Sequence, residues 1–153
     1  MKIAIGCDHG GFELKDKIVK ELEKKPELEK SNSDKSVDLV DCGCNGLDSV
    51  DYPMFAKSVA KKVASGEVDF GILVCTTGVG MCVQANKVKG VRAVLVLNED
   101  MAHMSREHNN CNVLCMGKKY TTIDEAMKYI EIFTSTPFSG GRHERRVNMF
   151  EQD

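Results

Sequence analysis

The segment FGILVCTTGVG, residues Phe70–Gly80, is the stretch from which the fold can be inferred first. Its first six residues are apolar without alternation, which is typical of a strand that is covered on both faces. The next five include Gly78 and Gly80, and a short helix is predicted to follow toward Lys87. A strand, a glycine-containing loop and a helix in this order predict one unit of an α/β fold.

The same alternation of strand and helix recurs on both sides of this segment. Further strands are predicted at residues 2–7, 37–42, 93–97 and 113–116. Helices are predicted over residues 11–24, from Phe55 to about Gly66, after Asn98, and from Thr122 through Phe133. Five strands that alternate with helices predict an α/β/α sandwich around a parallel sheet, most commonly with strand order 2-1-3-4-5.

Length and composition favour one globular domain. The chain has 153 residues, of which 42% are hydrophobic and 29% charged, so a single domain over residues 1–153 is expected. Residues 23–36 are predicted to form a polar connection, and residues 140–153 a basic, helical extension. The net charge of −2 argues against a nucleic-acid partner. No apolar run reaches transmembrane length, so no membrane partner is expected.

The seven cysteines predict free thiols in a reducing cytoplasm. They are Cys7, Cys42, Cys44, Cys75, Cys82, Cys111 and Cys115. Their number is odd, and the single close pair has C-x-C spacing rather than a standard zinc spacing. The N-terminus reaches Asp8 too early for a signal peptide. A thiol-redox or metal-binding protein is an alternative that lacks a standard signature, and no metal or cofactor is expected.

Topology predicts where a site would lie. Doubly wound sheets bind ligands at the carboxyl ends of their strands, where the strand order reverses. In the order 2-1-3-4-5, the loops after the first and third strands meet at this point. These loops are Cys7–Gly11 and Cys75–Gly80, and both are polar and rich in glycine.

The loop Thr76–Gly80 has the character of an anion cradle. Gly78 and Gly80 allow backbone N–H groups to approach a phosphate, and a helix start adds its positive end. The P-loop lysine is missing, and no G-x-G-x-x-G follows the first strand, so nucleotide and dinucleotide binding are disfavoured. A turn that needs glycine and binds nothing remains an open alternative.

Cys75 is the candidate reactive thiol. It ends the most apolar strand, and backbone amides and a helix start are predicted just beyond it, which lower a thiol pKa. Such a thiolate could act as a nucleophile or a general base. The remaining cysteines are interpreted as packing residues.

Histidine and arginine residues complete the candidates. His9 follows Asp8 and could bind a phosphate or hydroxyl group, and His108 is expected near the carboxyl edge because it precedes the fifth strand. His103 is interpreted as a solvated or interfacial residue. Arg142 and Arg146 share one face of the predicted helical extension, as suits a phosphate, although a solvated basic tail is the alternative.

Six motifs in register carry a family resemblance over almost the whole chain. They are GCDHGGF (6–12), DYP (51–53), CTTGVGMCVQANK (75–87), GVRAV (90–94), SREHNNCNVLCMG (105–117) and GGRHERRV (140–147). Together they resemble the sugar-phosphate isomerases that comprise ribose-5-phosphate isomerase B and galactose-6-phosphate isomerase subunits. The resemblance implies a Rossmann-like α/β/α sandwich and aldose–ketose isomerisation through a cis-enediolate, without metal or cofactor. It also implies homodimers or homotetramers with shared active sites.

The resemblance also implies roles for individual residues. Catalytic roles fall to Cys75 as proton acceptor and to Thr77 and His108 in ring opening. Substrate-binding roles fall to Asp8, His9, the backbone of Thr76, Gly78, Val79 and Gly80, and to Asn109, Lys119, Arg142 and Arg146. Two positions depart from the family. Thr76 replaces a frequent glycine and would strain the turn if that position needs a positive φ, and Lys119 replaces a frequent arginine.

The likeness leaves two alternatives to ribose 5-phosphate isomerisation. One is an isomerase of a six-carbon sugar phosphate, such as allose 6-phosphate or galactose 6-phosphate. The other is a sugar-phosphate binding protein without catalysis, against which the intact Cys75, Thr77 and His108 argue.

Overall fold

The fold was analysed in a computed structural model that describes residues 1–24 and 37–150. Most of the predicted polar connection 23–36 and the last three residues of the predicted extension 140–153 therefore lie outside the described residues. The strands are β1 Lys2–Cys7, β2 Asp38–Asp41, β3 Phe70–Cys75, β4 Ala93–Leu95 and β5 Val113–Gly117. The helices are α1 Phe12–Lys24, α2 Tyr52–Ala64, α3 Val79–Ala85, α4 Glu99–Asn109, α5 Ile123–Ser135 and α6 Arg142–Val147.

The five strands form one parallel sheet, as predicted, but their order is β2-β1-β3-β5-β4. The predicted order 2-1-3-4-5 is wrong at one edge, where β5 lies between β3 and β4. The burial of the two strands matches these positions, since all five residues of β5 are buried, whereas the three residues of the edge strand β4 are only partly buried. The reversal between β1 and β3 is unchanged, since β1 pairs with both β2 and β3.

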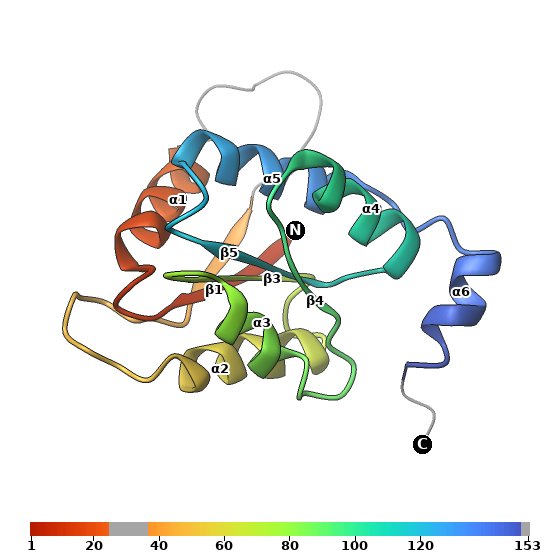
Figure 1. The fold of residues 1–153 in the computed structure, drawn as a ribbon, viewed down its shortest axis with the longest axis horizontal. Helices are drawn as coiled ribbons and strands as arrows, with labels where there is room; N and C mark the ends of the chain where they lie inside the picture. The colour runs from red at the N-terminus through yellow and green to blue at the C-terminus, as the bar shows by residue number, and fades with distance from the viewer. Residues whose placement is uncertain (25–36, 151–153) are drawn as a thin grey trace.

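Helices cover both faces of the sheet and complete the predicted sandwich (Figure 1). Ile5, Ile72 and Leu114 pack in one core with side chains of α1, α4 and α5. The neighbouring strand residues Leu73 and Cys115 point to the other face, where they pack with α2 and α3. The α6 helix lies outside the sandwich, beyond the end of α4. In the described part of the chain, no helix has both the length and the apolar composition needed to cross a membrane.

Candidate active site

The loops after β1 and β3 are in direct contact at the carboxyl edge of the sheet. The Asp8 N–H donates to the Val74 carbonyl over 3.3 Å. A Cβ atom on Gly11 would lie 2.3 Å from that carbonyl oxygen, and one on Gly10 would lie 2.2 Å from Thr76 Oγ1. The two glycines therefore let the first loop rest on the end of β3, which gives the juxtaposition expected from the topology.

Cys75 lies beneath this contact, with its thiol held by the backbone. Its side chain is buried, and its Sγ accepts the Gly78 N–H over 3.0 Å. Gly78 has a φ of +78°, and a Cβ there would lie 2.8 Å from the Met116 carbonyl carbon, so glycine is required for two reasons.

The α3 helix starts next to the turn that holds this sulfur. It begins at Val79, and the N–H groups of a first helical turn have no carbonyl partner within the helix. Thr77 Oγ1 accepts the Val79 N–H over 3.4 Å. The loop Thr76–Gly80 thus places a helix start close in sequence to the thiol, and a helix start suits an oxyanion or phosphate.

The β5 strand fixes the Thr76–Gly78 turn from the other side. The N–H groups of Lys118 and Lys119 donate to the carbonyls of Cys75 and Thr76 over 2.9 and 3.0 Å. Among the described residues, Asn110 is the non-glycine residue with a positive φ, so Thr76 does not carry the strain anticipated from the family pattern. The Lys119 ammonium lies 5.9 Å from the ring centroid of Tyr120.

Asp8 and His9 are oriented by the loops that carry them. Asp8 is buried, and its Oδ1 accepts the Gly11 N–H over 3.0 Å. His9 Nδ1 accepts the Val50 N–H over 3.2 Å, which assigns the proton of the neutral ring to Nε2. His9 can therefore donate an Nε2–H to an anion.

Tyr52 contacts the loop Thr76–Gly80, although it was not among the predicted site residues. A Cβ on Gly80 would lie 2.7 Å from Tyr52 Cζ and 3.1 Å from its hydroxyl oxygen, so the ring rests against the anion loop. Tyr52 begins α2, which follows β2 and therefore starts at the carboxyl edge. This topological rule, applied to the DYP motif, is the signal that could have identified it.

His108 lies at the opposite edge of the sheet. Gly71, near the start of β3, donates its N–H to the Asn112 carbonyl over 3.0 Å, and the Arg106 guanidinium lies 5.0 Å from the ring centroid of Phe70. The end of α4 thus contacts the amino ends of the strands. The expectation that His108 lies near the carboxyl edge is therefore wrong for a single chain. The six residues of β3 span roughly 17 Å, and this length separates the amino edge from the carboxyl edge, where Cys75 lies.

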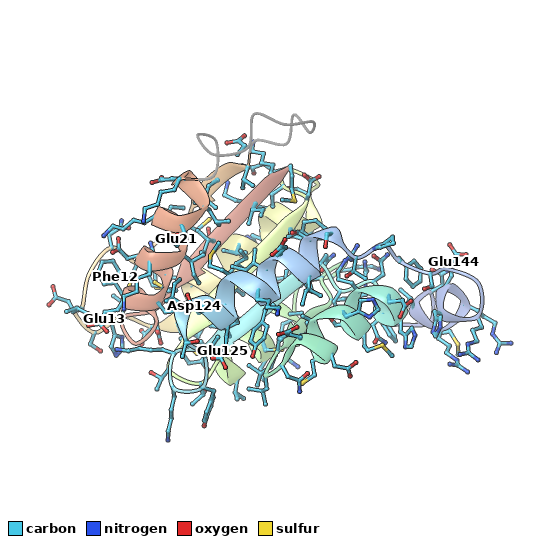
Figure 2. All side chains as sticks on the ribbon, turned by 90° about the horizontal axis from the view of Figure 1, so that it is seen from above. Phe12, Glu13, Glu21, Asp124, Glu125 and Glu144 are labelled. Carbon is cyan, nitrogen blue, oxygen red and sulfur yellow. The ribbon has the colours of Figure 1, made fainter. Side chains whose placement is uncertain are left out.

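Asn109, Arg142 and Arg146 share this amino edge with His108. The rings of His108 and His143 stack with centroids 4.1 Å apart and planes 9° apart, which joins α6 to α4. Desolvation lowers the pKa of His143, and the charges of His108 and the two arginines lower it further. Figure 2 shows Glu13 of α1 and Glu144 of α6 at opposite ends of the molecule. One chain therefore carries two separate halves of the predicted site.

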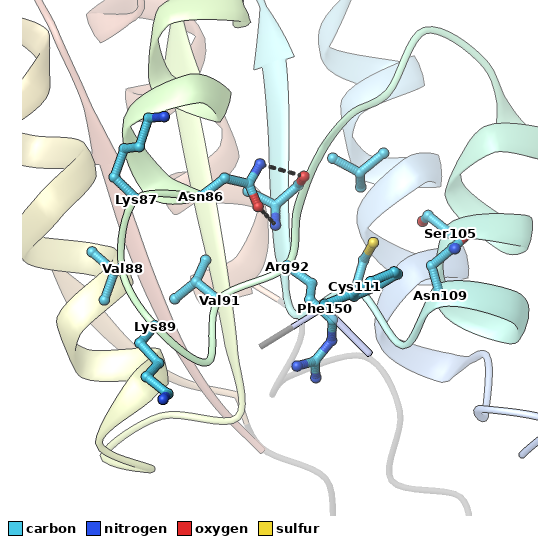
Figure 3. A pocket seen from close by; sticks show the side chains of 12 residues that line it. Asn86, Lys87, Val88, Lys89, Val91, Arg92, Ser105, Asn109, Cys111 and Phe150 are labelled. Carbon is cyan, nitrogen blue, oxygen red and sulfur yellow. Dashed lines mark hydrogen bonds between the residues drawn. The ribbon is translucent and has the colours of Figure 1, made fainter. Parts of the chain in front are cut away.

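A cavity of about 660 Å³ also lies at the amino edge (Figure 3). Asn109, Arg92 and Cys111 are among its lining residues. Burial raises the pKa of the Cys111 thiol to about 11, so this cavity lacks an ionised thiol near neutral pH.

The other thiols divide into two kinds. Burial raises the pKa of Cys7 to about 12, with a further rise from the neighbouring Cys44, and burial also raises the pKa of Cys42 and Cys115. Their interpretation as packing residues fits these values. Cys82 differs, because a hydrogen bond with Cys115 lowers its pKa. This contact joins residues far apart in the sequence and leaves no local signal.

Comparisons with known proteins show the family of this chain. Residues 3–150 match the family described as Ribose/Galactose Isomerase. The chain is 41% identical over 146 residues to ribose-5-phosphate isomerase B of Escherichia coli strain K12, covering 95% of this chain and 91% of the relative.

Two solved structures extend the likeness to three dimensions. A ribose 5-phosphate isomerase of Thermotoga maritima has a TM-score of 0.90 and 42% identity, with 99% of this chain and 98% of that chain covered. Ribose-5-phosphate isomerase B of Mycoplasma genitalium with bound ribulose-5-phosphate has a TM-score of 0.85 and 43% identity, with 96% and 91% covered.

Proposed function

Because this chain belongs to the ribose/galactose isomerase family, we propose that it interconverts ribose 5-phosphate and ribulose 5-phosphate. The observation that carries the proposal is the Cys75 thiol, held 3.0 Å from the Gly78 N–H where the loops after β1 and β3 meet. A thiolate at this point can act as a base, and the amides beside it can stabilise the oxyanion that forms when carbon loses a proton.

The reaction follows from these groups. In the open-chain aldose, the Cys75 thiolate takes the proton from C2, and the electron pair of that C–H bond forms the C1–C2 double bond of a cis-enediolate. The negative charge on O1 faces the N–H groups of the loop Thr76–Gly80. The thiol then returns its proton to C1, while the proton of the O2 hydroxyl passes to O1. The product is the ketose, and no atom or electron is gained or lost.

The phosphate end and the ring-opening step use the first loop. The His9 Nε2–H is the ring donor left for phosphate, because Nδ1 accepts the Val50 N–H. Binding energy from the phosphate holds C1 and C2 at the thiol. Asp8 and Thr77 are the candidates in this half of the site for proton transfer to the ring oxygen and from the C1 hydroxyl.

A second copy of the chain is proposed to complete the site. His108, Asn109, Arg142 and Arg146 lie at the amino edge, and α6 projects away from its own sandwich (Figure 1). Val79 and Val83 of α3 are about half exposed beside the Cys75 loop, which offers an apolar contact surface. We expect a homodimer or homotetramer in which each site combines the Cys75 loops of one protomer with the amino-edge residues of its partner.

The test is an isomerase assay on ribose 5-phosphate in the presence of EDTA. Wild-type protein is expected to be active without added metal, and Cys75→Ala is expected to lose isomerisation while it still binds the substrate in calorimetry. Cys42→Ala serves as the matched control, because Cys42 is half-buried at the end of β2 and outside the site. Near wild-type turnover by Cys75→Ala would show that Cys75 is not the base.

A further inference from the structure

The contact between Thr76 and Gly10 is where the two loops of the site meet most closely. Thr76 Oγ1 lies 2.2 Å from the point that a Gly10 Cβ would occupy, and Asp8 Oδ1 lies 3.3 Å from the same point. The hydroxyl and the carboxylate are therefore at most 5.5 Å apart. The Thr76 backbone is held in place, because its carbonyl accepts the Lys119 N–H over 3.0 Å.

This contact joins the loop that carries the thiol to the loop that carries the proposed phosphate donor. Thr76 directly follows the thiol that acts at C1 and C2, and Gly10 directly follows His9, the donor proposed for the phosphate. A sugar chain that joins the Cys75 loop to the His9 loop spans the place where these loops touch, and Thr76 Oγ1 lies at that contact. Thr76 is exposed, so this side chain borders open space rather than the protein core.

We propose that Thr76 determines the length of the sugar phosphate that the site accepts and favours five carbons over six. This inference rests on the proposed isomerase function. The threonine side chain has three heavy atoms, and a six-carbon substrate adds one hydroxymethylene group of two heavy atoms between its reacting carbons and its phosphate. The volume occupied by Thr76 is therefore of the size needed to exclude the additional group.

The test compares ribose 5-phosphate with allose 6-phosphate in wild type, Thr76→Gly, Thr76→Ser and Thr76→Val. Thr76→Gly is expected to change the ratio of the two kcat/KM values by about tenfold in favour of allose 6-phosphate, the discrimination that one such group supports. Thr76→Ser is expected to give a smaller change. Thr76→Val keeps the branched shape without the hydroxyl, so it should retain the wild-type preference.

Two outcomes would overturn the inference. An unchanged ratio in Thr76→Gly would show that this side chain does not limit length, and a lost preference in Thr76→Val would show that the hydroxyl rather than the volume decides. A ratio of two substrates in one protein is insensitive to a general loss of folded enzyme.

A binding measurement separates this inference from the proposed function. In a Cys75→Ser background, calorimetric Kd values for the two sugar phosphates report on length without catalysis. If the wild type isomerises neither compound, the proposed function fails, and the Kd ratio still decides the role of Thr76. The inference then holds if Thr76→Gly shifts that ratio toward allose 6-phosphate and fails if it does not.

Discussion

At Gly78 a single residue supports both the turn and the thiol. Its N–H is the donor to Cys75 Sγ, its φ is positive, and its Cα faces the Met116 backbone too closely for a side chain. The loop can present the thiol in this way only while position 78 is glycine.

Gly78→Ala is expected to lower the free energy of unfolding by about 3 kcal/mol, because a left-handed conformation and an overpacked contact add together. The matched control is Gly66→Ala, which has a φ of +73° but open space around a new Cβ, so it should lose about 1 kcal/mol. Urea unfolding of both variants measures the difference. Equal losses of unfolding free energy in the two variants would mean that the contact with Met116 does not contribute to the cost of Gly78→Ala.

Cys111 gives a pH dependence whose sign follows from its raised pKa. An unfolded thiol ionises near its ordinary pKa of about 8.5, whereas burial keeps Cys111 protonated in the folded chain up to about pH 11. Between these values the unfolded state has lost a proton that the folded state retains. Ionisation of Cys111 therefore leaves the unfolding free energy unchanged below about pH 8.5. Between about pH 8.5 and 11 it lowers the unfolding free energy by at most about 1.4 kcal/mol per pH unit.

Cys111→Ala should remove the part of the fall in unfolding free energy between pH 9 and 11 that is due to the Cys111 thiol. The difference in unfolding free energy between variant and wild type is expected to stay constant from pH 6 to 8, since neither state then exchanges a proton at this position. Above pH 9 the unfolding free energies of wild type and variant should approach each other, because only the wild type loses the contribution of this thiol. Parallel curves across the whole range would contradict the assigned role of Cys111.

At the scale of elements, α5 shows how local sequence defines a helix start. Thr122 Oγ1 accepts the Glu125 N–H over 3.3 Å, and the Glu125 carboxylate accepts the Thr122 N–H over 2.8 Å. This is the capping box that the sequence predicts. The backbone hydrogen bond from Thr122 is the main cause that lowers the pKa of Glu125.

Thr122→Ala is expected to lower the unfolding free energy by about 1 kcal/mol, the usual cost of a lost N-cap. Thr134→Ala is the control within the same helix, where the hydroxyl bonds only to the Ile130 and Glu131 carbonyls behind it. It should be neutral or slightly stabilising, because alanine has the higher helix propensity. Neither variant should change isomerase activity, and chemical denaturation distinguishes them.

Periodicity and caps predicted where strands and helices lie, but not which strands pair. The segments of β4 and β5 are both apolar, so their pattern did not show that β5 is the interior strand.

The direction of α4 was predictable. A helix that follows a parallel strand runs back to the amino edge, and this rule places His108 away from Cys75. The Cys75 loop was found because topology and glycine content point to the same place, whereas the lowered pKa of Cys82 depends on a tertiary contact.

At the scale of the whole molecule, the separation of the two half-sites predicts complementation between inactive chains. Cys75→Ala and His108→Ala remove groups from opposite halves. If sites are shared in a homodimer, a mixed dimer has one site with both defects and one intact site. In an equal mixture half of the dimers are mixed, so about a quarter of wild-type activity should return after subunit exchange.

The control pairs two defects from the same half. Cys75→Ala mixed with Thr77→Ala leaves one defect in every site, so no activity should return. Recovery in neither mixture would contradict the sharing of sites between subunits.

The interior position of β5 also constrains the order in which the nascent chain can fold. The chain leaves the ribosome N-terminus first, so β1, β2 and β3 can pair early, whereas β4 emerges before the one strand with which it pairs. Until Val113–Gly117 emerges, β3 presents an open edge that another nascent chain could pair with. At ordinary synthesis rates the stretch from Cys75 to Gly117 takes roughly two to eight seconds. Slow translation within it would lengthen the interval in which neighbouring ribosomes on one message can cross-pair their products.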